Sequence, residues 1–313
     1  MTSKYESPAT IIFFFFIVFS DSKQVCVLGG SGFLGSHVCD QLSEAGHKVL
    51  NFDQVISPWL RPDQEMIVGD LLDESMLTKA IEGCDVVYNF AAIADLDEAR
   101  NIPIETVRVN VLGNVLVLEA CRKSGVKRYI YASTLYVYSR EGGFYRCSKQ
   151  SAEHYVEEYQ RTFGLDYTIL RYGSLYGPRS DMRNGLWRIV KHALDTGKLL
   201  YKGSPEAMRE YIHVEDAARA SVTALENDFR NQHIVLTGQE PMRVYDLLKM
   251  LAEILGKPNS VEFVKSDYEG HYVRTPYAYQ PKLGHKYVPP MHVDLGQGLL
   301  QLIDEVQKTS IEH

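Results

Sequence analysis

A glycine-rich stretch near the N-terminus constrains the fold of this chain more than any other feature. Gly29, Gly32 and Gly35 have the spacing G-x-x-G-x-x-G, after an apolar, β-branched run at 25–28 and before a helical pattern at 36–42. A strand, a tight turn and a helix in this order are what dinucleotide binding requires. The glycines allow a close approach to a pyrophosphate, and the helix N-terminus offers free N–H groups. The alternative is a glycine-rich strand-to-helix turn without a ligand.

An acidic residue indicates which dinucleotide to expect. A second expected strand, 48–53, ends in Asp53, and no arginine follows it directly. An acid at this place can accept hydrogen bonds from the adenosine ribose and would repel a 2′-phosphate. We therefore expect NAD rather than NADP as the cofactor.

Composition excludes several other classes of protein. The 313 residues allow one large domain or two smaller ones. A net charge of −7 argues against a surface that neutralises the phosphates of nucleic acid. The five cysteines include no C-x-x-C pair, so we expect reduced thiols, a cytoplasmic protein and no metal site. These cysteines are Cys26, Cys39, Cys84, Cys121 and Cys147.

The N-terminus carries a continuous apolar run at 11–19. Its nine residues are far fewer than the roughly 20 that span a bilayer. As a signal peptide it lacks a positive flank, since Lys4 is offset by Glu6. We expect an extension outside the fold at 1–22, with a membrane contact as the alternative.

Strand and helix patterns alternate along the first half of the chain. Further strands are expected at 66–71, 85–92, 127–134 and 166–171, and long helices at 106–124 and 145–163. Alternation of this kind predicts an α/β fold with a doubly wound parallel sheet of the Rossmann type. We expect an NAD-binding domain at 23–175 and a mainly substrate-binding domain at 176–313, with segments near 210–240 returning to the sheet.

Tyr145 and Lys149 lie four residues apart, which places them on one face of the expected helix. A tyrosine is a weak base at its usual pKa near 10. We expect the Lys149 ammonium and the positive nicotinamide to lower the pKa of Tyr145, while Thr134 hydrogen-bonds the same substrate hydroxyl. The three residues would take a proton from an alcohol as its carbon is oxidised.

With these residues in place, the chain resembles an extended short-chain dehydrogenase/reductase of the nucleotide-sugar epimerase/dehydratase family from about 24 to 306. The motifs that carry the resemblance are Gly29-x-x-Gly32-x-x-Gly35, Asp53, Gly69-Asp70-Leu71, Ala91-Ala92, Asn110, Ser133-Thr134, Tyr145-x-x-x-Lys149, Leu170-Arg171-Tyr172, Tyr176-Gly177-Pro178-Arg179 and the segment 209–216. The resemblance implies a homodimer formed through the helices that begin at 106 and 145.

The resemblance also implies roles for individual residues. Thr134, Tyr145 and Lys149 take the catalytic roles, and Arg209 meets the substrate diphosphate, to whose oxygens a guanidinium offers several donors. The implied cofactor contacts are Gly29, Ser31, Gly32, Phe33, Leu34, Gly35, Asp53, Asp70, Leu71, Ala91, Ala92, Asn110, Tyr145, Lys149 and Tyr172. The implied substrate contacts are Ala94, Thr134, Tyr145, Ser174, Arg179, Arg209 and Arg274.

The chain departs from the family pattern next to Thr134. Members that remove water from the sugar carry an Asp-Glu pair where this chain has Leu135 and Tyr136, so we do not expect 4,6-dehydration. The segment between Tyr138 and Tyr145 is shorter than is usual in the family. Gly173-Ser174 replaces a Phe-Asn pair whose amide often holds the substrate.

Three functions follow from this pattern. We expect an NAD-dependent epimerase that transiently oxidises C4 of a nucleotide-diphosphate sugar. The first alternative is a one-way 4-dehydrogenase or 4-ketoreductase acting on a hexose or heptose. The second is a non-catalytic NAD-binding sensor or scaffold, because a fold alone does not establish an activity. No nucleic-acid partner is expected.

Overall fold

A computed structural model describes residues 22–238, 240–257, 260–264, 271, 272, 274 and 276. The apolar run at 11–19 lies outside these residues. Among the residues described, no helix combines the length and hydropathy that crossing a bilayer requires.

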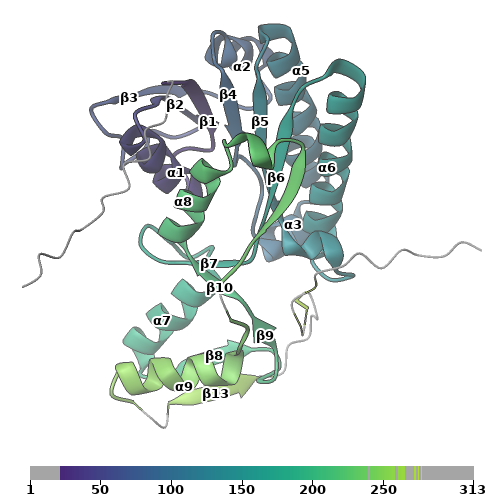
Figure 1. The fold of residues 1–313 in the computed structure, drawn as a ribbon. Helices are drawn as coiled ribbons and strands as arrows, with labels where there is room; N and C mark the ends of the chain where they lie inside the picture. The colour runs from purple at the N-terminus through teal and green to yellow at the C-terminus, as the bar shows by residue number, and fades with distance from the viewer. Residues whose placement is uncertain are drawn as a thin grey trace, which may run out of the picture. The chain divides into compact units, whose positions relative to one another are not determined.

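A seven-stranded parallel sheet forms the centre of the fold (Figure 1). The strand order is β11-β6-β5-β4-β1-β2-β3. The strands are β1 (Gln24–Leu28), β2 (Lys48–Asp53), β3 (Gln64–Val68), β4 (Val86–Asn89), β5 (Arg128–Thr134), β6 (Tyr167–Tyr172) and β11 (Gln232–Leu236). The expected doubly wound parallel sheet is confirmed, and β11 brings a late segment of the chain back beside β6.

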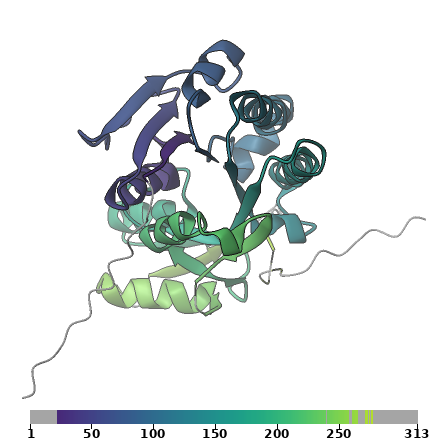
Figure 2. The same cartoon turned by 45° about the horizontal axis from the view of Figure 1, so that its top comes forward.

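Helices cover both faces of this sheet, as the two views in Figures 1 and 2 show. One face carries α1 (Phe33–Glu44) and α8 (Val214–Thr223); the other carries α2 (Glu74–Ile81), α5 (Asn114–Ser124) and α6 (Gly143–Phe163). Alternate residues of β1 enter the two cores, Val25 and Val27 on the α1 side and Cys26 and Leu28 on the other. Because both faces are buried, the strand is apolar from Val25 to Leu28.

Three of the expected elements differ from the structure, and one of them is the strand expected at 85–92, which is β4 and ends at Asn89. The expected helix at 106–124 is three segments: α4 (Pro103–Val107), a π-helical turn η1 (Arg108–Gly113) and α5. The side chain of Asn110, within the π turn, bonds the loop after β4 and α6 instead of facing solvent. The expected strand at 66–71 is β3, which ends at Val68, because the Asp70 carboxylate turns the chain by accepting from the Leu72 amide at 2.8 Å.

Shorter elements complete the described chain. Before β6 lie α3 (Leu96–Asn101) and the 3₁₀ turn η2 (Leu135–Tyr138). After β6 come β7 (Ser174–Tyr176), α7 (Gly185–Thr196), β8 (Leu199–Lys202), β9 (Met208–Arg209), β10 (Tyr211–His213), η3 (Asn227–Phe229), β12 (Met242–Arg243), α9 (Val244–Ile254) and β13 (Val261–Val264). β8 pairs with β13, and a small apolar cluster joins this pair to α7 and α9.

Candidate active site

The glycine-rich turn between β1 and α1 is packed tightly on its inner side and open on its outer side. A Cβ atom at Gly35 would lie 2.2 Å from the Gly29 carbonyl oxygen, and one at Gly29 would lie 2.7 Å from the Ala91 nitrogen. A Cβ at Gly32 would meet only the Gly29 oxygen, at 3.2 Å, among the described atoms in contact range. Among the residues that the structure describes, no side chain caps the N-terminus of α1. The turn therefore leaves space beside Gly32 and, in the described part of the chain, no side chain on the N–H groups at the start of α1, which fits the pyrophosphate of a dinucleotide.

Asp53 ends β2 beside this turn. Its Oδ2 accepts a hydrogen bond from the Ser31 amide at 3.0 Å, and its Oδ1 accepts from the Val55 amide at 3.3 Å. The Ser31 hydroxyl donates to the Val55 carbonyl at 2.8 Å. These bonds fix the carboxylate next to the glycine turn, where it has lone pairs left for a ribose.

Asn110 braces the site from the π turn. Its Oδ1 accepts from the Ile93 amide at 2.8 Å, and its Nδ2 donates to the Ile93 carbonyl and to the Ser148 hydroxyl, each at 2.9 Å. Every donor and acceptor of the amide is thus engaged by protein. The structure therefore connects Asn110 to the loop after β4 and to α6, and the loop holds Ala91 and Ala92.

Thr134, Tyr145 and Lys149 come together where β5 meets α6. Thr134 ends β5 and is buried, and its side chain hydrogen-bonds Tyr145. Lys149 follows Tyr145 by one helical turn, and its Nζ lies 5.9 Å from the centre of the Tyr145 ring. The same ammonium donates to the Ala132 carbonyl at 2.8 Å. The three side chains predicted to be catalytic are therefore neighbours.

Burial dominates the ionisation of this set. It lowers the pKa of Lys149 to about 7, with the nearby Glu153 carboxylate opposing that shift. It raises the pKa of Tyr145 to about 12, and the hydrogen bond from Thr134 opposes this rise. The expected lowering of the Tyr145 pKa is thus not found in the protein alone, because burial outweighs the hydrogen bond with Thr134.

Sequence reasoning missed an aromatic cluster that adjoins Tyr145. The ring of Tyr136 lies edge-on to Tyr145, with 6.5 Å between ring centres, and 4.9 Å from the ring centre of Tyr272. The Tyr136 hydroxyl bonds His271 Nδ1 at 2.5 Å. Burial and the neighbouring Tyr272 raise the pKa of Tyr136. No periodic pattern marks these residues, since His271 and Tyr272 are more than a hundred positions from Tyr136.

This cluster connects two of the expected substrate residues to the catalytic set. Arg209 is buried, and its Nη1 donates to the Tyr272 carbonyl at 2.6 Å. Its guanidinium carbon lies 4.8 Å from the centre of the Tyr272 ring. Ser174 hydrogen-bonds the Tyr272 side chain. Arg209 and Ser174 therefore share a neighbour with Tyr136.

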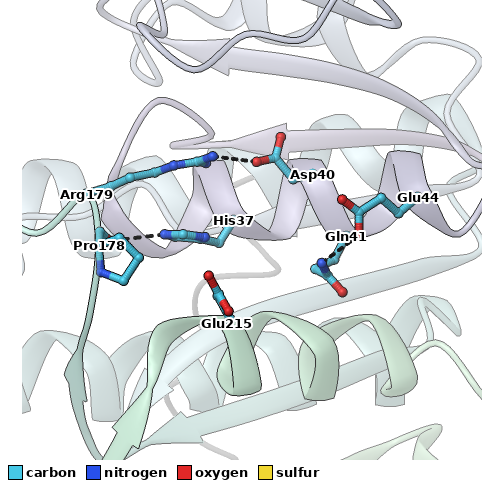
Figure 3. A pocket seen from close by; sticks show the side chains of 7 residues that line it. All are labelled: His37, Asp40, Gln41, Glu44, Pro178, Arg179 and Glu215. Carbon is cyan, nitrogen blue, oxygen red and sulfur yellow. Dashed lines mark hydrogen bonds and ion pairs between the residues drawn. The ribbon is translucent and has the colours of Figure 1, made fainter.

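Arg179 is separate from this cluster and contacts helix α1. Its backbone is in the left-handed region at φ 66°, and its Nη2 donates to Asp40 Oδ2 at 2.7 Å. Figure 3 shows this ion pair beside His37, whose Nε2 donates to the Pro178 carbonyl at 3.0 Å. The structure thus commits the Arg179 guanidinium to α1, because an acid faces it there, and does not join it to the catalytic set.

The remaining expected contacts are dispersed. The Tyr172 hydroxyl bonds Ser221 on α8 at 2.7 Å, and Leu71 is packed in the core. Asp70, Ala94 and Arg274 are exposed. The expected site residues that the structure holds in a defined arrangement are therefore those of the glycine turn, Asp53 and the set Thr134, Tyr145 and Lys149.

A parallel sheet with this first turn defines a dinucleotide-binding α/β protein. Residues 25–238 match the profile of the NAD dependent epimerase/dehydratase family, and the chain belongs to this family. The chain is therefore a member of an NAD-dependent enzyme family, as its motifs indicated.

Solved structures and a curated relative agree with this membership. The UDP-glucose 4-epimerase of Thermotoga maritima, solved with UDP-glucose, is 28% identical with a TM-score of 0.75, covering 82% of this chain and 90% of that one. The UDP-glucuronic acid 4-epimerase of Bacillus cereus, solved with UDP-glucuronic acid and NAD, is 27% identical with a TM-score of 0.74, covering 83% and 95%. The dTDP-D-glucose 4,6-dehydratase of Mus musculus is 27% identical over 267 residues, which are 77% of this chain and 75% of the relative.

Proposed function

We propose that the protein is an NAD-dependent nucleotide-sugar epimerase that acts by transient oxidation at C4 of the sugar. The observation that carries this proposal is the convergence of Thr134, Tyr145 and Lys149 at the end of β5. Similarity to two UDP-sugar 4-epimerases favours a UDP-linked sugar as the substrate. Residues 23–175 would bind NAD, and residues 176–313 mainly the sugar nucleotide.

The catalytic residues divide the proton chemistry between them. NAD, when bound, would supply a hydride acceptor for the oxidation of C4 and a hydride donor for its later reduction. Tyr145 removes the proton of the C4 hydroxyl and returns it, while Thr134 orients that hydroxyl. A buried phenol with a pKa of about 12 holds its proton at neutral pH, so the positive charge of Lys149 is needed close to it. Arg209, buried near the same cluster, would bind the diphosphate.

We further propose that the protein does not catalyse 4,6-dehydration. Elimination of water requires an acid and a base next to Thr134. Leu135 is buried and apolar, and Tyr136 has a raised pKa and a hydroxyl bonded to His271. Neither side chain is suited to proton transfer at neutral pH. A product lighter than the substrate by one water, detected by mass spectrometry, would contradict this exclusion.

The cysteines support a proposal about the cellular compartment of the enzyme. All five cysteines are free, and only Cys147 among them is exposed. Free thiols persist in a reducing compartment, so we propose a cytoplasmic enzyme.

Proton NMR of the purified protein with a panel of nucleotide sugars and no added cofactor tests the epimerase. Conversion to a second sugar over many turnovers is the expected result, because NAD would be recycled within the site. At most one equivalent of keto sugar would instead indicate a one-way dehydrogenase. No reaction with any sugar would indicate another alcohol substrate or a non-catalytic protein.

Tyr145→Phe is the matched variant for this assay. It removes one hydroxyl and leaves the ring, so NAD should still bind. We expect turnover to fall by about 10²–10⁴-fold, the usual contribution of a general acid–base group. Unchanged turnover would exclude Tyr145 from the chemistry.

A further inference from the structure

Glu153 is a buried acid that the proposed chemistry does not use. It lies on α6, one turn after Lys149 and two turns after Tyr145, so the three share a helix face. Only 5% of the residue is exposed. A carboxylate at this depth needs partners for its charge.

Side chains from two other elements, β5 and β6, hydrogen-bond Glu153. The Ser133 hydroxyl donates to its Oε1 at 2.5 Å. Arg171, on β6, donates through Nε to Oε1 at 3.0 Å and through Nη2 to Oε2 at 2.5 Å. The same guanidinium donates through Nη1 to the Tyr138 hydroxyl of η2 at 2.5 Å. Glu153 thus joins α6 to the ends of β5 and β6 next to Thr134, and Arg171 extends this link to η2.

Within the described part of the chain, few groups compensate the charge of Lys149. Its ammonium bonds the Ala132 carbonyl and lies 4.8 Å from the centre of the Tyr131 ring. Burial lowers the pKa of Lys149, and Glu153 is the negative charge that opposes this. A carboxylate one turn away therefore favours the charged form of the amine.

We propose that Glu153 is a positioning residue of this site, which favours the ammonium form of Lys149 and holds Thr134 in place through Ser133. The proposal rests on the proposed function, which assigns roles to Lys149 and Thr134. Its physical basis is that one buried carboxylate has two effects. Its negative charge stabilises the charged amine of Lys149, and its hydrogen bond with Ser133 fixes the end of β5.

Other titratable groups lie near Glu153 and Lys149 and can also affect the pKa of Lys149. Arg171 on β6 carries the opposite charge, Tyr138 on η2 bonds it, and the rings of Tyr131 and Tyr145 flank Lys149. Further along α6, Glu157 pairs with His233 of β11 at 2.9 Å, and burial lowers the pKa of that histidine. Glu157 is thus a carboxylate on the same helix that does not bond β5.

NMR of protein labelled at lysine Cε tests the proposal directly, because it reports the ionisation of Lys149 without any turnover. The Lys149 signal is assigned by its loss in Lys149→Met. In Glu153→Gln we expect the pKa of Lys149 to fall by about one unit or more. Glu157→Gln is the control, and there the pKa of Lys149 should stay within a few tenths of the wild-type value.

Two further variants separate the charge from the hydrogen bonds. Ser133→Ala keeps both charges, so it should leave the Lys149 pKa near wild type and lower turnover through Thr134. If Glu153→Gln does not fold because Arg171 is left unpaired, Glu153→Gln/Arg171→Met removes both charges and should still lower the pKa of Lys149.

An unchanged Lys149 pKa in the folded Glu153 variants would overturn the proposal. If the pKa falls but no sugar is converted by the wild type, the epimerase assignment fails while the role of Glu153 toward Lys149 stands. With an active wild type, the alkaline loss of turnover should move to lower pH in Glu153→Gln by the same amount as the NMR titration.

Discussion

Gly32 offers a direct test of the cofactor cradle, because alanine there should affect the ligand and spare the fold. Its backbone, at φ −78° and ψ 178°, suits alanine. The added Cβ would lie 3.2 Å from the Gly29 oxygen, which a movement of a few tenths of an ångström relieves. The lower entropy of the unfolded alanine chain offsets this contact, so we expect stability within about 1 kcal/mol of wild type. On the outer side of the turn, however, the methyl group would occupy the approach of a pyrophosphate.

We expect Gly32→Ala to weaken NAD binding tenfold or more, which is about 1.4 kcal/mol. The assay is calorimetric titration of cofactor-stripped protein with NAD, beside urea unfolding of the same samples. Gly46→Ala is the matched control: Gly46 has φ +85° and open space around its Cβ, so the change should cost about 1–2 kcal/mol of stability and leave NAD affinity unaltered.

Gly35→Ala, unlike Gly32→Ala, is expected to damage the fold itself. Its Cβ would lie 2.2 Å from the Gly29 oxygen, an overlap of about 1 Å with backbone that cannot yield, so we expect both stability and NAD binding to be lost. The reasoning is refuted if Gly32→Ala binds NAD as tightly as the wild type, or if Gly46→Ala weakens binding as much.

Three further predictions follow from named side chains. Asp53→Ala should weaken NAD and reduce the preference over NADP, and an unaltered ratio of the two dissociation constants would exclude contact with the ribose. In cofactor-free protein, burial holds the pKa of Lys149 at about 7 against an ordinary 10.5. The unfolded chain therefore binds more protons between these values, and this residue makes the free energy of unfolding rise with pH across that window. Urea unfolding should show that rise in the wild type and a smaller one in Lys149→Met; equal slopes would contradict it. Finally, we expect a homodimer through the α4–α6 surface, where Ile104 is 77% and Val107 is 55% exposed, so Ile104→Asp should give a monomer in light scattering while a monomeric wild type would overturn the expectation.

Most of the fold was predictable because its signals are local. The apolar run before Gly29 and the strand that ends in Asp53 each specify a buried parallel strand from neighbouring residues alone. The Tyr145–Lys149 spacing likewise needs only the pitch of one helix. One exception is the helix expected at 106–124, where the contacts of Asn110 with Ile93 and Ser148 favour a π turn. Those partners are too distant in sequence for a periodic pattern to show them.

The sequence by itself determined the parallel sheet, the glycine turn and the residue types of the catalytic set. Only the tertiary structure decided which charges these residues meet. It pairs Arg179 with Asp40, turns Tyr136 toward Tyr145 and buries Glu153 between Ser133 and Arg171. The physical reason is range: helix and strand patterns depend on residues a few positions apart, whereas burial and ion pairing depend on which segments pack together, and packing sets the pKa of Lys149.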